Sequence, residues 1–204
     1  VNAGLLLGES LITLCSNFAE VVYDGVSIDN HARLSKKYQY ADAALNSWQY
    51  VVHAVAKAVT ANVKNLDFNT LPGIKGIVTI AKHNFLIEHG HVIRGWSGFP
   101  WYGASRIKSK EAVRRMKLAR EQWRNEHDQV KQDWGFDYWI FGHFHTGCNP
   151  EEDTYVNGST QGTTEFDHGQ GRYAKPSQTA ALVHPEHGLF NLTKFYARRS
   201  NGQV

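Results

Sequence analysis

The chain has 204 residues, of which 42% are hydrophobic and 20% charged, a composition typical of a globular protein. Its formal net charge of +3 suits a phosphate-bearing ligand but is too small to indicate nucleic-acid binding. Its two cysteines, Cys15 and Cys148, form no CxxC motif, which argues against a disulfide scaffold and suits a reducing compartment. Because no apolar run approaches the roughly 20 residues of a membrane span, we expect a cytoplasmic protein without membrane contact.

The first part of the chain predicts two helices around a strand. Hydrophobic residues recur at helical spacing over residues 3–20, and residues 41–64 gather alanine, valine and aromatic positions on one face of a long helix. Between them, residues 21–28 form a β-rich run that ends in Asp-Asn-His, which predicts a strand delivering polar residues to a loop. Leu-Pro-Gly at 71–73 ends this part with residues that favour a turn.

The next part predicts three strands, a loop and the clearest helix of the chain. Residues 76–91 predict two short strands joined near His83 and Asn84. The residues 95–105 are rich in glycine and tryptophan and predict a loop, whereas residues 109–134 predict a helix with alternating charge. Residues 136–145 then predict a strand that runs into a polar tip.

The C-terminal part predicts short antiparallel strands with tight turns, including a turn at residues 184–188. Strands and helices thus occur throughout the chain, with no internal repeat and no clear linker between domains. The sequence therefore predicts a single α/β domain over residues 1–204, with mixed strands.

Three of the predicted strands end in histidine-bearing tips, at residues 28–33, 87–91 and 140–145. In extended backbone, residues two apart lie on the same face, so His143 and His145 are predicted to address one point. Neutral imidazole is a common metal ligand that suits Zn, Mn, Fe or Ni rather than Mg or Ca. Active sites of α/β proteins gather at such strand ends, so the three tips together predict a metal site.

Any single histidine is more often a structural residue than a ligand. His53 in a predicted helix, His127 in a charged helix and the turn at residues 184–188 fit that structural interpretation. Only the three strand tips share one pattern, a hydrophobic strand followed by polar residues.

The three tips carry Asn30-His31, His89-Gly90-His91 and Gly142-His143-Phe144-His145, in this order. This series resembles the last three motifs of the calcineurin-like metallophosphoesterases, and the resemblance covers the chain from about residue 20 to its end. The C-terminal part is similar to phage and prophage members of that superfamily. The resemblance implies an α/β fold with mixed β-sheets packed as a sandwich flanked by helices, and a location in the host cytoplasm if a phage encodes the chain.

The resemblance also implies a role for each motif residue. It assigns metal binding to four side chains, Asn30, His89, His143 and His145. Of these, His145 would bind the first metal and the other three the second. His31 would be catalytic, donating a proton to the leaving oxygen or stabilising the developing charge. His91 is assigned to the substrate and is also a second candidate ligand, and the implied cofactor is Mn, with Fe, Zn or Ni as alternatives. Arg33 lies two residues past His31, so strand alternation places it to meet a phosphate oxygen of the substrate.

The chain departs from the family pattern in its first 29 residues, which contain neither an Asp-x-His nor a Gly-Asp motif. The four assigned ligands are all neutral, so no bridging carboxylate offsets the repulsion between two divalent ions. We therefore expect at most one metal ion in this chain. Two ions are expected if the missing motifs are supplied by a preceding segment or by another chain of an oligomer.

The implied function is metal-dependent phosphoester hydrolysis of the phosphodiesterase or nuclease type, with water activated by a dinuclear centre. The alternative is a truncated or metal-poor relative that serves as a non-catalytic binding or structural module. A nucleic-acid substrate would use the aromatic residues 95–105 for stacking, although the same rings could cover the core. The basic residues of the predicted helix could contact its backbone, but their alternation with acids favours a solvated face. They are Arg114, Arg115, Lys117, Arg120 and Arg124.

Overall fold

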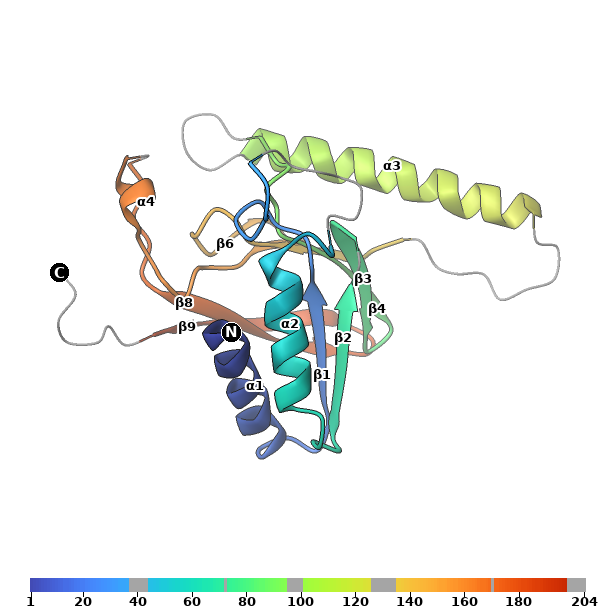
Figure 1. Ribbon diagram of the computed structural model, residues 1–204. Coiled ribbons are helices and arrows are strands. Elements are labelled where there is room, and N and C mark those ends of the chain that lie inside the picture. The colour runs from blue at the N-terminus through green and yellow to red at the C-terminus, as the bar shows by residue number, and fades with distance from the viewer. Residues whose placement is uncertain (37–43, 72, 95–100, 126–134, 170, 198–204) are drawn as a thin grey trace. The chain divides into compact units, whose positions relative to one another are not determined.

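The computed structural model describes residues 1–36, 44–71, 73–94, 101–125, 135–169 and 171–197 (Figure 1). The chain divides into two compact units, Val1–Gly76 and Ile77–Val204. The prediction of one domain over residues 1–204 stays a prediction. In the described part of the chain, no helix is long and apolar enough to cross a membrane.

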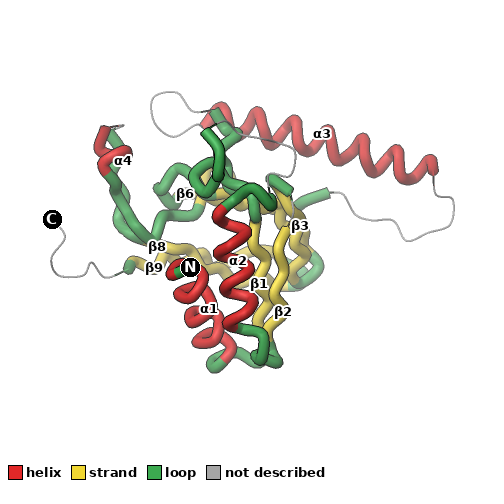
Figure 2. The backbone as a smooth tube through the Cα atoms, viewed as in Figure 1, coloured by secondary structure: helices red, strands yellow, loops and turns green. Residues whose placement is uncertain are grey.

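The first unit combines two packed helices with a two-stranded parallel sheet. The helices are α1 (Asn2–Cys15) and α2 (Trp48–Val59), and the strands are β1 (Val21–Val26) and β2 (Leu66–Leu71). Figure 2 shows both helices beside this sheet, and the register places Val21 opposite Leu66. The connection between the parallel strands runs through α2, as parallel pairing requires.

The second unit is built on a five-stranded mixed sheet in the order β3-β4-β5-β7-β6. These strands are β3 (Lys75–Ile80), β4 (His83–Glu88), β5 (Tyr138–Phe141), β6 (Cys148–Glu151) and β7 (Thr154–Val156). β4, β5 and β7 run parallel, whereas β6 is antiparallel to β7. The mixed α/β fold class predicted from the sequence is confirmed.

Two helices and a hairpin complete the second unit. The helices are α3 (Trp101–Asn125) and the short α4 (Glu165–Gly169), and the hairpin joins β8 (Ser177–His184) to β9 (Gly188–Tyr196). The predicted turn at residues 184–188 is confirmed, since it links these two strands.

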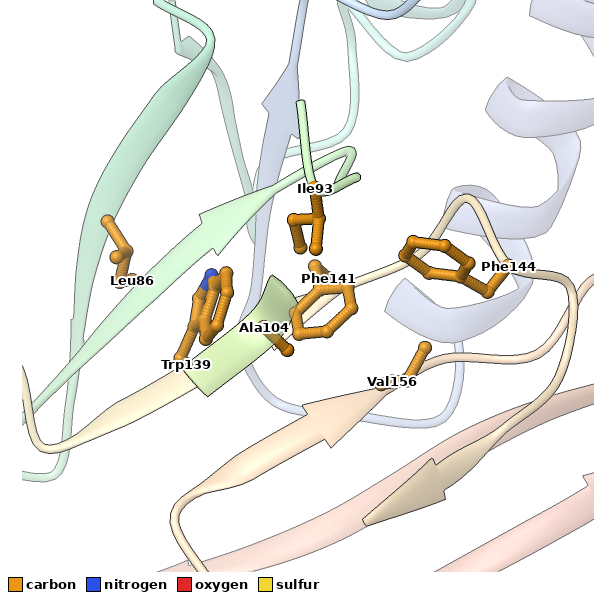
Figure 3. Close-up of a cluster of buried hydrophobic side chains, with 7 residues drawn as sticks. All are labelled: Leu86, Ile93, Ala104, Trp139, Phe141, Phe144 and Val156. Carbon is orange, nitrogen blue, oxygen red and sulfur yellow. The ribbon is translucent and has the colours of Figure 1, made fainter. Parts of the chain in front are cut away.

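The core of the second unit lies between the sheet and the first turns of α3. Its central residues come from three strands, the loops that follow them and the helix, as Figure 3 shows: Leu86, Ile93, Ala104, Trp139, Phe141, Phe144 and Val156. Trp139 and Leu86 are fully buried. Burial of apolar surface stabilises a fold by roughly 25 cal/mol per Å². The buried side chains of this core therefore hold the ends of β4 and β5 in place. The candidate site follows directly after these ends.

Several boundaries differ from the prediction. The predicted helix over residues 41–64 begins only at Trp48, because Ser47 is the N-cap and its Oγ accepts a hydrogen bond from the Gln49 amide at 3.1 Å. The predicted loop at 95–105 is wrong from Trp101 onward, where α3 begins. Ala104 and Ile107 of that segment are three residues apart on one helical face and pack against the core.

The helix α3 is tied to the sheet by charged side chains. Lys108 donates to Glu151 at 2.6 Å and also pairs with Asp153, which joins the helix to the turn between β6 and β7. Burial lowers the pKa of Lys108, but its hydrogen bonds to the two carboxylates outweigh this and raise it. A cavity of about 540 Å³ lies beside this ion pair. The predicted helix over residues 109–134 is confirmed as far as Asn125, and its remainder, with His127, lies outside the described residues.

Candidate metal centre

The candidate site of the second unit lies where two neighbouring parallel strands end. β4 ends at Glu88, which pairs with Phe141, the last residue of β5. The residues that follow both strands therefore emerge at the same edge of the sheet. The Gly142 amide donates a hydrogen bond to the His89 carbonyl at 3.1 Å and so holds the two loops together.

Glycine is required at Gly90 in the first of these loops. Its φ is +100°, a conformation that side chains rarely adopt. An added Cβ would also lie 3.1 Å from the Phe141 ring and 3.2 Å from the Gly142 carbonyl oxygen. The close approach of the two loops thus depends on a residue without a side chain.

The central feature is a pair of histidines. His143 Nδ1 lies 3.1 Å from His89 Nε2, and the ring centroids are 5.0 Å apart. This distance suits one hydrogen bond between the rings. It also suits two ligands of one ion, because nitrogens each about 2.1 Å from a metal and about 90–110° apart are separated by about 3.0–3.4 Å. The two imidazoles therefore fit a shared divalent cation.

His91 lies beside this pair. Its ring centroid is 5.5 Å from that of His89, with a tilt of 38° between the rings. Its role as a second ligand or substrate contact stays a prediction.

His143 and His145 do not share a face of extended backbone, so that part of the prediction is wrong. β5 ends at Phe141, and the two histidines follow in a loop with φ of 72° and 60°, both in the left-handed region. Two residues in this conformation turn the chain sharply, so alternation along a strand no longer applies. His145 is instead directed to a different partner, Asp167, through a 2.9 Å contact between its Nδ1 and the Asp167 Oδ2.

Asp167 was not singled out by the sequence analysis. It is 2% exposed and lies in the five-residue helix α4. Burial raises the pKa of Asp167, but hydrogen bonds from His145 and Thr164 outweigh this and hold the pKa below its usual value. The signal that could have found it is the series Thr164-x-x-Asp167, which matches a helix capping box.

The donor set around the histidine pair is neutral. Within the described residues of the second unit, no carboxylate gathers with His89 and His143 closely enough to share an ion, and no second ligand group forms around His145. Neutral imidazoles suit Zn, Mn, Fe or Ni. A carboxylate ligand would be needed to bring a second divalent ion close to the first.

Comparisons with known proteins leave the family open. No protein-family model matches the chain, and no curated protein matches it. Among solved structures, the chain is similar to a single mutant of Vps29 from Entamoeba histolytica. The sequence identity is 10% and the TM-score 0.38, and the match covers 87% of this chain and 99% of that chain. This similarity assigns neither a family nor an activity.

Three further predicted site residues lie in the first unit, in the loop after β1. Asn30 is half-buried, whereas His31 and Arg33 are exposed. Asp29 shapes this loop, because its Oδ1 accepts hydrogen bonds from the amides of His31 and Ala32, both at 2.6 Å. Arg33 forms an isolated antiparallel bridge with Ser47. The roles assigned to Asn30, His31 and Arg33 stay predictions.

Two histidines outside the tips have structural partners, as the sequence analysis favoured. His53 is buried, with its Nε2 3.0 Å from the Tyr23 hydroxyl and 2.9 Å from the Gln49 side chain. His184 Nδ1 accepts hydrogen bonds from the amides of Glu186 and His187 at 3.1 and 3.2 Å. Both rings therefore hold local structure together.

The predicted nucleic-acid surface is only partly described. Trp101 is 55% exposed, whereas Trp96 and Phe99 lie outside the described residues. Arg114 is exposed and pairs with Glu111 at 3.3 Å. Arg115 departs from the predicted solvated face, because it is buried and its Nε donates to Glu111 at 2.9 Å. The side chains of Arg120 and Arg124 are not described.

Proposed function

We propose that the chain is a metal-binding member of the calcineurin-like metallophosphoesterase superfamily that hydrolyses phosphoesters. The observation that carries this proposal is the 3.1 Å separation of His89 Nε2 and His143 Nδ1 at the shared end of two parallel strands. The order of the three histidine-bearing motifs along the chain supports it. Because imidazole ligands suit a transition metal, Mn is the proposed cofactor, with Fe, Zn or Ni as alternatives.

In this proposal each residue has a distinct task. A divalent ion bound in such a centre supplies Lewis acidity toward a phosphoryl oxygen and activates water. His89 and His143 hold the ion, together with Asn30 if the motif assignment is correct. His31 gives a proton to the leaving oxygen, and Arg33 binds a phosphate oxygen of the substrate.

The substrate class that we propose is a phosphodiester, with nucleic acid as one candidate. The exposed Trp101 ring offers a stacking surface of the kind that single strands use. A cytoplasmic setting, in a phage-infected host or otherwise, suits such a substrate. A preceding segment or a second chain that supplies carboxylates would raise the number of ions from one to two.

A second candidate function is a non-catalytic binding or structural module. The neutral ligand pair favours it, because no carboxylate of the described second unit joins His89 and His143. Without a bridging carboxylate, a second ion and the water that it activates are not stabilised. A single weakly bound ion would then serve structure or binding rather than hydrolysis.

The test is Mn²⁺ binding by isothermal titration calorimetry, followed by hydrolysis of bis-p-nitrophenyl phosphate with Mn²⁺ present. We expect His143→Ala and His89→Ala each to weaken binding at least tenfold and to abolish turnover. The control is His187→Ala, which changes an exposed histidine in the β8–β9 turn. It should alter neither quantity by more than twofold.

Three outcomes separate the candidates. Metal binding with turnover that depends on His143 supports the hydrolase. Metal binding without turnover supports the non-catalytic module. Absence of Mn²⁺ binding in the unsubstituted chain, checked with Zn²⁺ and Ni²⁺ as well, contradicts the proposed metal centre.

A further inference from the structure

The charges of α3 are not distributed evenly around the helix. Along its sequence Glu111 interrupts the basic residues, and such alternation is typical of a solvated face. In the folded chain Glu111 is 7% exposed and Arg115 8%, and the two form a buried pair at 2.9 Å. Among the side chains of α3 that the structure describes, at residues 101–119, Glu111 is the only carboxylate. Its burial therefore leaves the exposed side of this part of α3 without a negative charge.

Four cations on the exposed side of α3 form what we call the basic stripe. Arg106, Lys110, Arg114 and Lys117 are all exposed and follow one another at intervals of three or four residues, so they lie on one face of the helix. Within the described residues, Arg106, Lys110 and Lys117 form no ion pair. Arg114 lies 3.3 Å from Glu111, but its side chain stays 65% exposed. The basic stripe is thus a positive surface that is open to solvent.

An aromatic ring stands at the N-terminal end of the basic stripe. Tyr102 is 81% exposed and precedes Arg106 by four residues, which places it on the same face of α3. Nucleic-acid bases stack on exposed aromatic rings whatever their sequence, because every base has a π-face. Cations that follow a backbone, next to a ring that stacks on bases, are the combination by which proteins bind single strands.

The length of the basic stripe suits a row of phosphates. From Arg106 to Lys117 the helix rises by about 16 Å, at roughly 1.5 Å per residue. A nucleic-acid strand carries one phosphate per about 3.4 Å of helical rise, so about five phosphates span this length. Four cations therefore meet a similar number of anions. The net charge of +3 does not reveal this, because clustering on one face, rather than the total, indicates such a surface.

A membrane surface is a less suitable partner for α3. A helix that lies in a membrane interface turns its apolar face toward the lipid. The apolar residues Ala104 and Ile107 of α3 instead pack against the core of the second unit. An acidic peptide would satisfy the cations but has no base to stack on Tyr102. The charge and the exposed ring together favour nucleic acid.

We propose that the basic stripe and Tyr102 form a binding surface for single-stranded nucleic acid, with the cations on the phosphates and the Tyr102 ring against a base. Binding of this kind needs no metal ion, so it serves the hydrolase and the non-catalytic module alike. The role of the bound strand as a substrate rests on the proposed function.

The experiment is fluorescence anisotropy of the full chain in EDTA, with a labelled oligothymidylate of about 15 nucleotides. Four phosphate contacts should give a slope of about −2.8 in log K against log salt concentration, at about −0.7 per contact in single strands. The affinity should then fall about 50-fold between about 50 and 200 mM salt. The double variant Arg106→Gln/Lys110→Gln should halve this slope and weaken binding at least tenfold at the lower salt concentration.

The matched control is Lys82→Gln/Lys175→Gln, which removes two exposed cations of the second unit outside α3. It changes the net charge equally, and it should keep the slope and stay within about threefold in affinity. Tyr102→Ala should weaken binding by about five- to a hundredfold without changing the slope, because a stacked base is lost but no phosphate contact. Tyr102→Phe should restore the affinity, since it keeps the ring.

Four results would overturn the proposal. The first is no binding of the oligothymidylate at about 50 mM salt. The second is an equal loss in the two double variants, which would assign binding to the net charge. The third is equal affinity for heparin together with full binding by Tyr102→Ala, which would leave only a polyanion site. The fourth is binding of phosphatidylserine vesicles through Arg106 and Lys110 without binding of the strand, which would identify a membrane surface.

These results stay separate from those that test the proposed function. A chain that hydrolyses bis-p-nitrophenyl phosphate but does not bind the oligothymidylate contradicts only the surface on α3. A chain that binds the strand in EDTA but shows no turnover with Mn²⁺ supports the surface and contradicts the hydrolase.

Discussion

At the scale of single residues, the first unit holds an uncharged pair made of a buried histidine and a half-buried tyrosine. Tyr23 and His53 contact each other at 3.0 Å, and burial raises the pKa of Tyr23 to about 12. Burial also lowers the pKa of His53, because the protonated ring would lose its hydration. Within the described residues its Nδ1 is buried without a hydrogen-bond partner. The ring therefore resists protonation in the folded state.

This gives a prediction for stability against pH. In the unfolded chain His53 takes up a proton near pH 6.5, whereas in the folded chain it does so only at lower pH. The unfolded state thus binds more protons below about pH 6.5, and the free energy of unfolding should fall as the pH falls through that range. Urea unfolding at pH 8, 7, 6 and 5 measures it.

The matched variants are His53→Gln and His187→Gln. The first should cost about 1–3 kcal/mol at pH 8, since the half-buried Tyr23 and Gln49 lose their hydrogen-bond partner, but should flatten the decline below pH 6.5. The second changes an exposed ring and should keep both the stability and the decline. An equally steep decline in His53→Gln would assign the pH dependence to other groups.

The sequence could predict that His89 and His143 come together, but not the backbone geometry of the candidate site. His89, His143 and His145 each follow a hydrophobic run in the sequence, and this pattern predicts histidines at strand ends. The left-handed backbone at His143 and His145 was not, because non-glycine residues rarely adopt it. Asp167 was missed because a helix of five residues is too short to show periodicity.

At the scale of elements, a close helix–helix contact of the first unit joins α1 to α2. Gly4 and Gly8 of α1 are buried, and an added Cβ on Gly8 would lie 2.7 Å from Val59 Cγ1 and 2.9 Å from Val59 Cβ. Real Cβ atoms do not approach a neighbour this closely. The two helices can therefore keep this distance only with glycine at the contact.

Gly8→Ala tests this packing, because the direction in which it changes the free energy of unfolding depends on how close the two helices are. In an exposed helix, alanine stabilises by up to about 1 kcal/mol relative to glycine. Here the added methyl group overpacks the contact, which typically costs about 1–3 kcal/mol, so the free energy of unfolding should fall. Thermal unfolding measures it, with Ser10→Ala as the control on the exposed side of α1. A stabilised Gly8→Ala variant would contradict the close contact.

The strands were easier to predict than the helix boundaries. β1, β4 and β5 are short hydrophobic runs with abrupt polar ends, and each was recognised within a few residues. The start of α3 was not, because the glycine and aromatic residues at Trp101–Gly103 favour a loop when considered locally. Burial of Ala104 and Ile107 against the core outweighs that preference.

At the scale of the whole molecule, the predicted ligands are distributed over two units. His89, His143 and His145 belong to Ile77–Val204, whereas Asn30 and His31 belong to Val1–Gly76. A bound ion stabilises those parts of a chain that contribute ligands. If both units become more stable when metal binds, both contribute ligands. If only the second unit does, the ligands come from that unit alone.

Hydrogen exchange measured by mass spectrometry, with and without Mn²⁺, provides this test. We expect slower exchange in peptides that cover β4 and β5 and the loops after them, because ordering these loops reduces local opening. If Asn30 is a ligand, residues 27–36 should be protected as well. Protection of the second unit alone would contradict the roles assigned to Asn30 and His31. His143→Ala should remove all metal-dependent protection.

At His143 and His145 the left-handed backbone lowers stability, although the proposed function requires the first of these histidines. Each residue costs roughly 1–2 kcal/mol relative to a conformation free of strain, and glycine would remove that cost. A library randomised at both positions and selected only for thermal stability should become enriched in glycine and asparagine. The same library selected for Mn²⁺ binding should return histidine at position 143. The difference between the two selected pools would measure, residue by residue, how much stability the chain gives up for its imidazoles.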